Sequence, residues 1–324
     1  MTPTSPDSQH GNGVTARRWA GIFRDLGHRV DLAQDYRAGQ YDLLVALHAV
    51  KSAAAVRAFR AEQPAAPVVI ALTGTDLYPD LSVTGVEPGV LTIASRLVVL
   101  QSHGKDQVPP ELRDRVRVIV QSMTAVPPVP PDPDCFEVAF LAHLRPVKDP
   151  LLLAAAVQYL PASSRIRITH AGEGRDPALA SRAAATSAAS RRYTWLGPLP
   201  RSQALHVLAR SRLLAVTSVH EGGANVVTEA LASGVPVVSS EIPGSTGLLG
   251  ADYPGYFRAG DPVDLARVLS AAEEDKGGFY QLLRQRCAQL RPLADPARER
   301  AAWAALLAEL NVKAPGEPAR LSPR

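Results

Sequence analysis

Short apolar runs alternate with helical segments along almost the whole chain. The runs are rich in β-branched residues and are bounded by Gly, Pro or polar residues, which is typical of strands buried on both faces. Alternation of strand and helix requires parallel strands joined by right-handed crossovers. The sequence therefore predicts an α/β fold. The predicted strands are Leu43–Leu47, Val68–Leu72, Leu97–Leu100, Val116–Val120, Glu137–Leu141, Arg165–Thr169, Leu213–Val216 and Val235–Ser239.

The first predicted helix shows how these segments bury one face. Trp19, Ile22, Phe23 and Leu26 recur at a spacing that places them on one apolar stripe. Gly27 follows as a natural C-terminal stop. Two further helices are predicted, at Asp149–Leu160 and Ser202–Ser211.

A proline-rich segment interrupts the alternation. Val126–Asp134 carries five prolines in nine residues, which neither a helix interior nor a central strand accepts. A chain of 324 residues has room for two domains of about 100–200 residues each. We therefore expect domains at residues 1–130 and 135–292, and a Pro-rich, polar tail at 312–324 that is predicted to be disordered.

The start of the chain departs from the usual α/β order. A Gly-rich turn, His10-Gly11-Asn12-Gly13, precedes the first helix, but Thr, Pro, Ser and Asp stand where an apolar strand is expected. We expect the first strand to be very short, missing or truncated.

Composition excludes several classes of protein. The formal charge is 35 − 31 = +4, and aromatic residues make up 5%, which does not favour a nucleic-acid partner. No apolar run approaches the ~18–20 residues that span a bilayer. Cys135 and Cys287 form no pair motif, and the N-terminus shows no secretory signal. The predicted location is the cytoplasm.

The most informative segment is Val216–Ser239. A predicted strand is followed by a Gly-rich loop and by a helix that starts near Asn225 and ends at Gly234. The N-terminus of a helix carries free N–H groups and partial positive charge, so it suits a diphosphate or sugar phosphate. Glu221 and Glu229 bracket the unit, and their carboxylates suit sugar hydroxyls and a ribose diol. The candidate ligand-binding residues between them are Gly222, Gly223, Ala224 and Asn225.

Two further turns follow strands of the second domain. Ala142–Pro150 carries Arg145 and Lys148, which suit a diphosphate leaving group, although a solvated basic turn is the alternative. Gly172 and Gly174 are also candidate donor-binding residues. Their turn lacks the third glycine of a dinucleotide fingerprint, so a close strand-to-helix turn is the default interpretation.

Polar residues of the first domain follow its predicted strands. Ligands of open α/β sheets bind beyond the carboxyl ends of strands, so these residues are candidates for binding a second substrate, although each alone is more typical of surface or capping chemistry. The candidates are Gly11, Asn12, Gly13, Arg17, His48, Lys51, Asp76, His103 and Lys105.

Several catalytic motifs are excluded. His220-Glu221 does not continue into HExxH, because residue 224 is Ala, and neither a Walker phosphate loop nor a GxSxG elbow occurs. Asp132-Pro133-Asp134 has the form of a metal-binding DxD but lies in the proline-rich segment, so it is interpreted as linker.

The spacing Glu221–Glu229 resembles the E-x7-E motif of GT-B glycosyltransferases of the family-4 type, and the match continues through WLGPLPRSQALHVLARSRLLAVTS before it and EALASGVPVVSS after it. The resemblance implies two Rossmann-like domains with parallel sheets facing an interdomain cleft. It also implies a nucleotide-sugar donor held by residues 135–292, no obligatory metal or other cofactor, and a C-terminal helix at 293–311 that crosses back to the first domain.

The resemblance also implies residue roles. Glu229 matches the glutamate that binds the ribose, Glu221 the one that contacts the donor sugar, and Lys148 the conserved basic residue; these roles make Glu221, Arg145 and Lys148 the candidate catalytic residues. Ala142 and His143 stand where the family has Gly-Arg, so Arg145 is a less secure match for the Arg.

A narrower resemblance joins segments of both domains, among them GNGVTARRWAGIFRDLGHRV, LTGTDLYPDL, HLRPVKDP and GLLGADYPGYF. Together they look like the selenosugar synthases of selenoneine biosynthesis. That group is implied to join selenophosphate to the sugar of a UDP-sugar, such as UDP-N-acetylglucosamine, with release of UDP. A selenium anion needs no general base, unlike a hydroxyl. A family-4 glycosyltransferase with a hydroxyl acceptor, a nucleotide-sugar epimerase and a non-enzymatic binding protein remain open alternatives.

Overall fold

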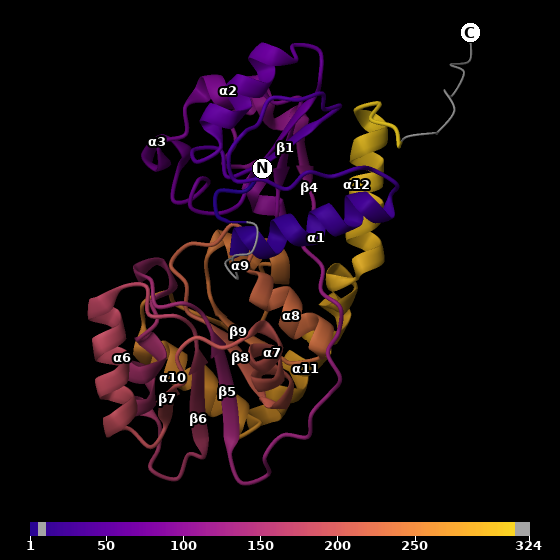
Figure 1. Cartoon of the computed structure of the whole chain (residues 1–324). Coiled ribbons are helices and arrows are strands. Elements are labelled where there is room, and N and C mark those ends of the chain that lie inside the picture. Colours follow the sequence, from indigo (N-terminus) through magenta and orange to yellow (C-terminus); the bar gives the residue numbers. More distant parts are fainter. Residues whose placement is uncertain (6–10, 315–324) are drawn as a thin grey trace. The chain divides into compact units, whose positions relative to one another are not determined.

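The computed structural model describes residues 1–5 and 11–314. The chain forms two compact units (Figure 1): unit 1 comprises residues 1–120 and the C-terminal segment from Ala297, and unit 2 comprises residues 121–296. Each unit is an α/β structure built on one parallel sheet. The α/β fold with two parallel sheets that the sequence predicts is therefore confirmed.

Unit 1 has a four-stranded sheet in the order β1-β2-β3-β4, with all pairs parallel. Successive side chains of β2 point to opposite faces of the sheet, and both faces are buried. Val68, Ile70 and Leu72 belong to one core cluster, and Val69 and Ala71 belong to the other. The strands are β1 (Leu44–Leu47), β2 (Val68–Leu72), β3 (Arg96–Val99) and β4 (Val116–Val118).

Two helices from opposite ends of the chain cover one face of this sheet. Trp19 of α1 and Trp303 of α12 join the core cluster that contains Val69 and Ala71, and Figure 1 shows the two helices side by side. The sequence predicts the apolar stripe of α1, and the structure confirms it. The helices of unit 1 are α1 (Gly11–Asp25), α2 (Ala53–Glu62), α3 (Leu81–Thr84), α4 (Pro88–Ile93) and α12 (Pro296–Glu309), with 3-10 turns at Ser102–Lys105 and Pro110–Arg115.

A buried carboxylate fixes α12 against α1. The indole rings of Trp19 and Trp303 meet edge to face with centroids 4.7 Å apart. Glu299, which is 1% exposed, accepts a hydrogen bond of 2.7 Å from Trp19 Nε1 and forms an ion pair with Arg18. A buried charge is tolerated only when it is paired and hydrogen-bonded in this way.

Unit 2 has a six-stranded parallel sheet in the order β10-β9-β8-β5-β6-β7. The chain builds outward from β5 to β7 and then returns to place β8 on the other side of β5. This reversal of strand order is a topological switch point, next to which ligands bind in open α/β sheets. The strands are β5 (Phe136–Leu141), β6 (Ile166–Ala171), β7 (Tyr193–Trp195), β8 (Leu213–Val216), β9 (Val237–Ser240) and β10 (Tyr256–Phe257).

The helices of unit 2 surround this sheet (Figure 1). They are α5 (Leu152–Ala156), α6 (Pro177–Ala189), α7 (Arg201–Arg210), α8 (Asn225–Ser233), α9 (Pro243–Leu249), α10 (Pro262–Glu273) and α11 (Phe279–Leu290), with 3-10 turns at Pro146–Lys148, Val157–Tyr159, Lys276–Gly278 and Arg291–Ala294.

The structure corrects two details of the predicted elements. The helix expected over Asp149–Leu160 is the shorter α5, because Asp149 adopts a left-handed conformation with φ 40° and the chain tightens into a 3-10 turn after Ala156. The strands β7 and β10 were not predicted, because three and two residues are too short to show a strand pattern.

The proline-rich segment has neither helix nor strand. The boundary between the units lies between Val120 and Gln121, so this segment belongs to unit 2. Asp134 donates its backbone N–H to the Asp132 carboxylate at 2.8 Å, a local turn bond typical of a loop.

The first two residues lie alongside β1. The Met1 amino group donates to Val45 O at 2.7 Å, and Leu47 donates to Met1 O at 3.1 Å. Of the predicted Gly-rich turn, His10 lies outside the described residues, whereas Gly11 begins α1. The predicted tail is described only as far as Ala314, and residues 315–324 lie outside the described part.

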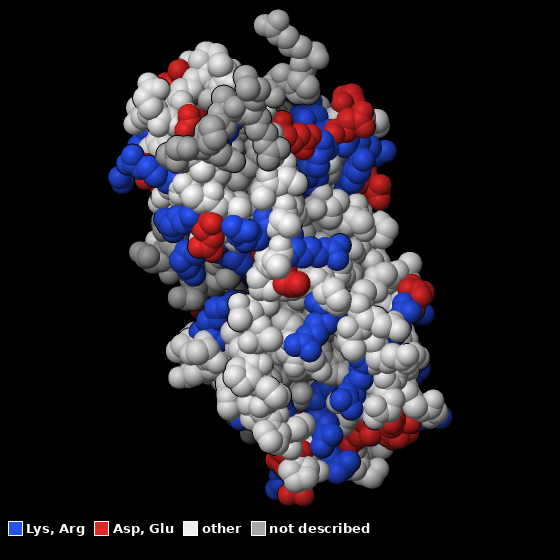
Figure 2. Space-filling view, turned by 90° about the vertical axis from the view of Figure 1, so that its right-hand side faces the viewer, with Lys and Arg blue, Asp and Glu red and all other residues white. Residues whose placement is uncertain are grey.

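The surface carries charge of both signs. Figure 2 shows Lys and Arg side chains spread over one face in small groups, with Asp and Glu side chains among them. Within residues 1–5 and 11–314, no helix combines the length and the apolar character that crossing a membrane requires.

Candidate functional site

The loops that follow the neighbouring strands β5 and β8 are joined by direct hydrogen bonds. Val219 donates its N–H to Val147 O at 2.9 Å. The Thr217 hydroxyl lies 2.8 Å from Lys148 O and 3.0 Å from Asp149 O. These bonds fix the basic turn predicted from the sequence beside the Gly-rich loop. We call the polar side chains of these two loops and of α7 and α8 the β5–β8 cluster, which comprises Lys148, Arg201, Ser218, Glu221 and Glu229.

Lys148 and Glu221 form an ion pair within the β5–β8 cluster. The Ser218 hydroxyl donates to Glu221 Oε1 at 2.7 Å. The side chains of Lys148 and Glu221 are 25% and 12% exposed, so both remain accessible to a ligand. The start of α9 supports the loop from behind, because Gly244 approaches the backbone of Glu221 so closely that a Cβ atom has no room.

Glu229 has a different partner. It lies on the second turn of α8, and its side chain, 9% exposed, pairs with the guanidinium of Arg201 at 2.6 Å. Arg201 is the first residue of α7 and also contacts Met123 Sδ at 3.3 Å. The two glutamates of the motif are thus each paired with a cation from another element.

The Gly-rich loop leads directly into α8. Gly222 and Gly223 precede Ala224, which is the N-cap residue and provides no side-chain hydrogen bond to the helix. The helix begins at Asn225 and ends at Gly234, whose φ of 71° needs a glycine. The predicted start and end of this helix are confirmed. The partial positive charge at the start of this helix suits an anion.

The other predicted residues of unit 2 differ in their surroundings. Arg145 is half-buried, and among the described residues its guanidinium has no hydrogen-bond or ion-pair partner. Gly172 packs against the carbonyl of Ala142, and Gly174 packs against Ala180. Close packing against backbone at Gly172 and against side chains at Gly174 leaves no room for a Cβ atom at either position, as in a tight strand-to-helix turn.

A buried histidine stabilises the same turn. His170 Nε2 lies 2.9 Å from Ala142 O, and His170 Nδ1 lies 2.7 Å from the Tyr193 hydroxyl. Because the carbonyl only accepts, Nε2 donates and Nδ1 accepts from Tyr193. Burial lowers the pKa of His170 to about 4, so the ring is neutral near pH 7.

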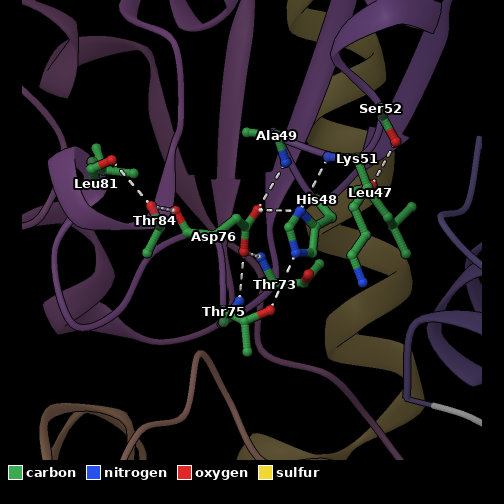
Figure 3. Close-up of polar contacts among 11 residues, drawn as sticks. Leu47, His48, Ala49, Lys51, Ser52, Thr73, Thr75, Asp76, Leu81 and Thr84 are labelled. Atoms are coloured by element: carbon green, nitrogen blue, oxygen red, sulfur yellow. Dashed lines mark hydrogen bonds and ion pairs between the residues drawn. The ribbon is translucent and has the colours of Figure 1, made fainter.

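In unit 1, a buried aspartate joins the loops after β1 and β2 (Figure 3). Asp76 is 0% exposed, and its carboxylate accepts the N–H groups of Ala49, Thr73 and Gly74 at 2.8–2.9 Å. The sequence analysis gives Asp76 as a candidate for binding the second substrate. It is enclosed by backbone, so its role is to fix both loops rather than to contact a substrate.

His48 lies against this aspartate at the end of β1. It adopts a left-handed conformation with φ 71°. Its Nε2 lies 3.1 Å from Thr75 Oγ1, and its Nδ1 lies 3.4 Å from the N–H of Lys51. Burial lowers the pKa of His48, the nearby Lys51 acts in the same direction, and Asp76 opposes them. The exposed side chain of Lys51 supplies positive charge beside this ring (Figure 3).

The remaining predicted residues of unit 1 lie elsewhere on its loops and helices. Gly11, Asn12 and Gly13 form the first turn of α1, and Arg17 follows on the second. His103 lies on the 3-10 turn after β3, 3.4 Å from the Asp106 carboxylate. Lys105 ends that turn.

Two residues of the site, Arg201 and Gly244, are not predicted from the sequence. A weak signal for Arg201 exists, because a cation at the first position of a helix opposes the helix dipole and is favoured there by an anionic partner. The close approach of Gly244 to Glu221 joins residues distant in sequence and leaves no such signal. Among residues 1–5 and 11–314, no group of three His, Cys, Asp or Glu side chains is arranged to hold a metal ion.

Several solved structures share this fold. Anabaena HepE in complex with UDP and glucose superposes with a TM-score of 0.66 at 18% identity, covering 83% of this chain and 78% of that one. Sucrose-phosphate synthase from Thermosynechococcus elongatus gives a TM-score of 0.68 at 16% identity, covering 84% and 74%. At these identities the likeness shows the GT-B fold alone.

Comparison of the sequence with known proteins identifies its family. The D-inositol 3-phosphate glycosyltransferase of Mycolicibacterium smegmatis is 33% identical over 129 residues, which cover 37% of this chain and 29% of that protein. The match therefore spans less than a third of the relative. The sequence model of the family described as "Glycosyl transferases group 1" matches residues 127–290, about half of the chain. By that match, which includes the whole β5–β8 cluster, the chain belongs to the glycosyl transferases group 1 family.

Proposed function

We propose that the protein is a glycosyltransferase that uses a UDP-sugar donor. The observation that carries this proposal is the pairing within the β5–β8 cluster. Glu221, in the loop before α8, pairs with Lys148, and Glu229, on the second turn of α8, pairs with Arg201. This combination offers hydrogen-bond acceptors for a sugar and a ribose, and cationic groups for a diphosphate. A UDP complex of Anabaena HepE, which shares the fold, supports the choice of donor.

Within this cluster, each group has a distinct part in the proposed reaction. Lys148 and the N–H groups at the start of α8 hold the diphosphate and stabilise the charge that develops on it as the anomeric C–O bond breaks. Arg145, which has no described partner, adds a second cation. Glu221 holds hydroxyl groups of the donor sugar, and Glu229 holds the ribose diol. When a diphosphate arrives, it competes with Glu221 for the Lys148 ammonium group.

We propose selenophosphate as the acceptor. Its selenium attacks the anomeric carbon, a C–Se bond forms, the C–O bond to the diphosphate breaks, and UDP leaves with the electron pair. The nucleophile is already ionised, so the step needs no general base. The resemblance of segments in both units to selenosugar synthases supports this acceptor, and the exposed Lys51 supplies positive charge that suits an anion.

A phosphorylated alcohol is the second candidate acceptor. The Mycolicibacterium smegmatis relative is named for D-inositol 3-phosphate, an acceptor that also carries a phosphate. Lys51 suits either anion, whereas a hydroxyl nucleophile requires a base. Asp76 is enclosed by backbone N–H groups, which argues against its use as that base.

The test is product analysis under anaerobic conditions. The protein is mixed with UDP-N-acetylglucosamine and selenophosphate, and the products are identified by mass spectrometry. We expect UDP together with a sugar that contains selenium. Parallel reactions replace selenophosphate with inositol 3-phosphate, or omit the acceptor. UDP release only with the inositol phosphate would reject selenophosphate, and no turnover of UDP-sugar with any acceptor would reject the transferase function.

A further inference from the structure

We propose that Arg201 is a positioning residue that sets the preference of this site for ribonucleotides. The inference rests on the proposed donor function, in which Glu229 holds the ribose diol. Arg201 would then act on the ribose through Glu229 rather than by direct contact.

The geometry of the pair carries this inference. Arg201 Nη2 lies 2.6 Å from Glu229 Oε1, and this ion pair holds one carboxylate oxygen. Glu229 is 9% exposed, so its charge needs this partner to be stable inside the unit. With Oε1 held, the orientation of the carboxylate is fixed, and Oε2 remains available to accept hydrogen bonds from the two hydroxyls of a diol.

Arg201 is itself held in place. The same Nη2 contacts Met123 Sδ at 3.3 Å, and the backbone of Met123 is anchored by donation to Ala294 O at 3.0 Å. The residue also begins α7, where its own backbone is fixed by the helix. Arginine presents a planar fork with little freedom once anchored. The guanidinium is therefore preorganised to orient Glu229 before a ligand arrives.

A cation at this position is otherwise unfavourable. The N-terminus of a helix carries partial positive charge, which disfavours an arginine at the first position of α7. An ion pair with an anionic group offsets this cost, and Glu229 is that group.

Binding of paired nucleotides tests the inference. Dissociation constants of UDP and 2′,3′-dideoxy-UDP are measured by calorimetry for the wild type, Arg201→Ala, Arg201→Lys and Glu229→Gln. For the wild type we expect UDP to bind at least about tenfold more tightly than the dideoxy analogue, since charged hydrogen bonds to the diol are lost in the analogue. Arg201→Ala should weaken UDP binding by about tenfold and leave dideoxy-UDP within twofold, so that the discrimination disappears. Arg201→Lys should restore part of it.

The controls separate positioning from general damage. Arg267→Ala removes another arginine of unit 2 that is paired with a carboxylate, Asp264 at 2.7 Å, and should change neither constant. Thermal unfolding of each variant reports whether it folds. If Arg201→Ala does not fold, the test is carried out with Arg201→Lys.

Different outcomes contradict different claims. Equal weakening of both nucleotides by Arg201→Ala, or tighter binding of UDP, would overturn the positioning role while leaving the donor site intact. If the wild type itself binds no UDP, or does not distinguish it from the dideoxy analogue, the proposed role of Glu229 in binding the donor ribose fails, and the inference falls with it.

Discussion

The Lys148 ammonium group pairs with the Glu221 carboxylate across two loops that are 73 residues apart in the chain. Each charge compensates the other in the unliganded protein. Under the proposed function, we expect a donor diphosphate to replace Glu221 as the partner of Lys148 and so to free Glu221 for the sugar.

Removing Lys148 should therefore impair the reaction more than the fold. We expect Lys148→Ala to lower kcat by about 10²–10³-fold, because one preorganised cation at the leaving group is lost. Steady-state kinetics with a UDP-sugar and selenophosphate measures this. Lys276→Ala, an exposed lysine of the same unit, serves as the control and should leave kcat unchanged. A Lys148→Ala enzyme with normal kcat would contradict the assignment.

Glu299 should be essential for the packing of α12 on α1. We expect Glu299→Ala to lower the free energy of unfolding by about 3 kcal/mol, because Arg18 and Trp19 lose a buried acceptor. Glu299→Gln should cost less, since its amide oxygen still accepts from Trp19. Urea denaturation measures both variants. Glu309→Gln, which removes a surface carboxylate paired with Arg96 and Arg117, should cost less than about 1 kcal/mol. Equal losses of unfolding free energy at positions 299 and 309 would refute the role of Glu299 as a buried acceptor.

His170 should make stability depend on pH. Its pKa is lowered from 6.5 to about 4 in the folded protein, so below pH 6.5 the unfolded chain binds a proton that the folded chain does not. The contribution of His170 to the free energy of unfolding is thus fully present above pH 6.5 and is lost as the pH falls toward 4. Between pH 7 and pH 5 the loss is about 2 kcal/mol.

The measurement is the free energy of unfolding at pH 7, 6 and 5. We expect His170→Gln to show a smaller loss than the wild type over this range, because a glutamine does not titrate and still offers a donor to Ala142 O and an acceptor to Tyr193. His206→Gln, at an exposed position of α7, should behave like the wild type. Identical pH profiles for the wild type and His170→Gln would show that the pH dependence of stability does not come from this ring.

Gly244 should tolerate no side chain. A Cβ at residue 244 would collide with the backbone of Glu221, so Gly244→Ala should displace the Glu221 loop and reduce UDP-sugar turnover more than tenfold, at a cost of roughly 1–3 kcal/mol in stability. Gly21→Ala is the matched control, because nothing lies within 4 Å of its Cβ position in α1, and it should stabilise the protein by about 0.5–1 kcal/mol. Normal turnover by Gly244→Ala would show that the loop position is not critical.

The sequence predicts much of this fold because its main elements have local signals. The β-branched runs mark the longer strands, and the apolar stripe with Gly27 marks α1. The strands β7 and β10 are missed because their two or three residues are held at the sheet edges by pairing with β6 and β9 rather than by a local pattern.

The candidate site divides in the same way. The spacing of Glu221 and Glu229 is local and visible in the sequence. Their partners, Lys148 and Arg201, come from other elements, so the pairing depends on the order of strands in the sheet. The sequence also does not reveal that Asp76 is enclosed by backbone, because its three donors lie on two loops.

The return of α12 to unit 1 also affects the order of synthesis. Trp303 and Glu299, which complete the core beside α1, are translated only after all of unit 2. A nascent chain that stops at residue 295 would leave Trp19 without both partners. Unit 2 is contiguous and can finish folding on the ribosome first, since domains fold as units during translation, whereas unit 1, although it begins earlier, closes last.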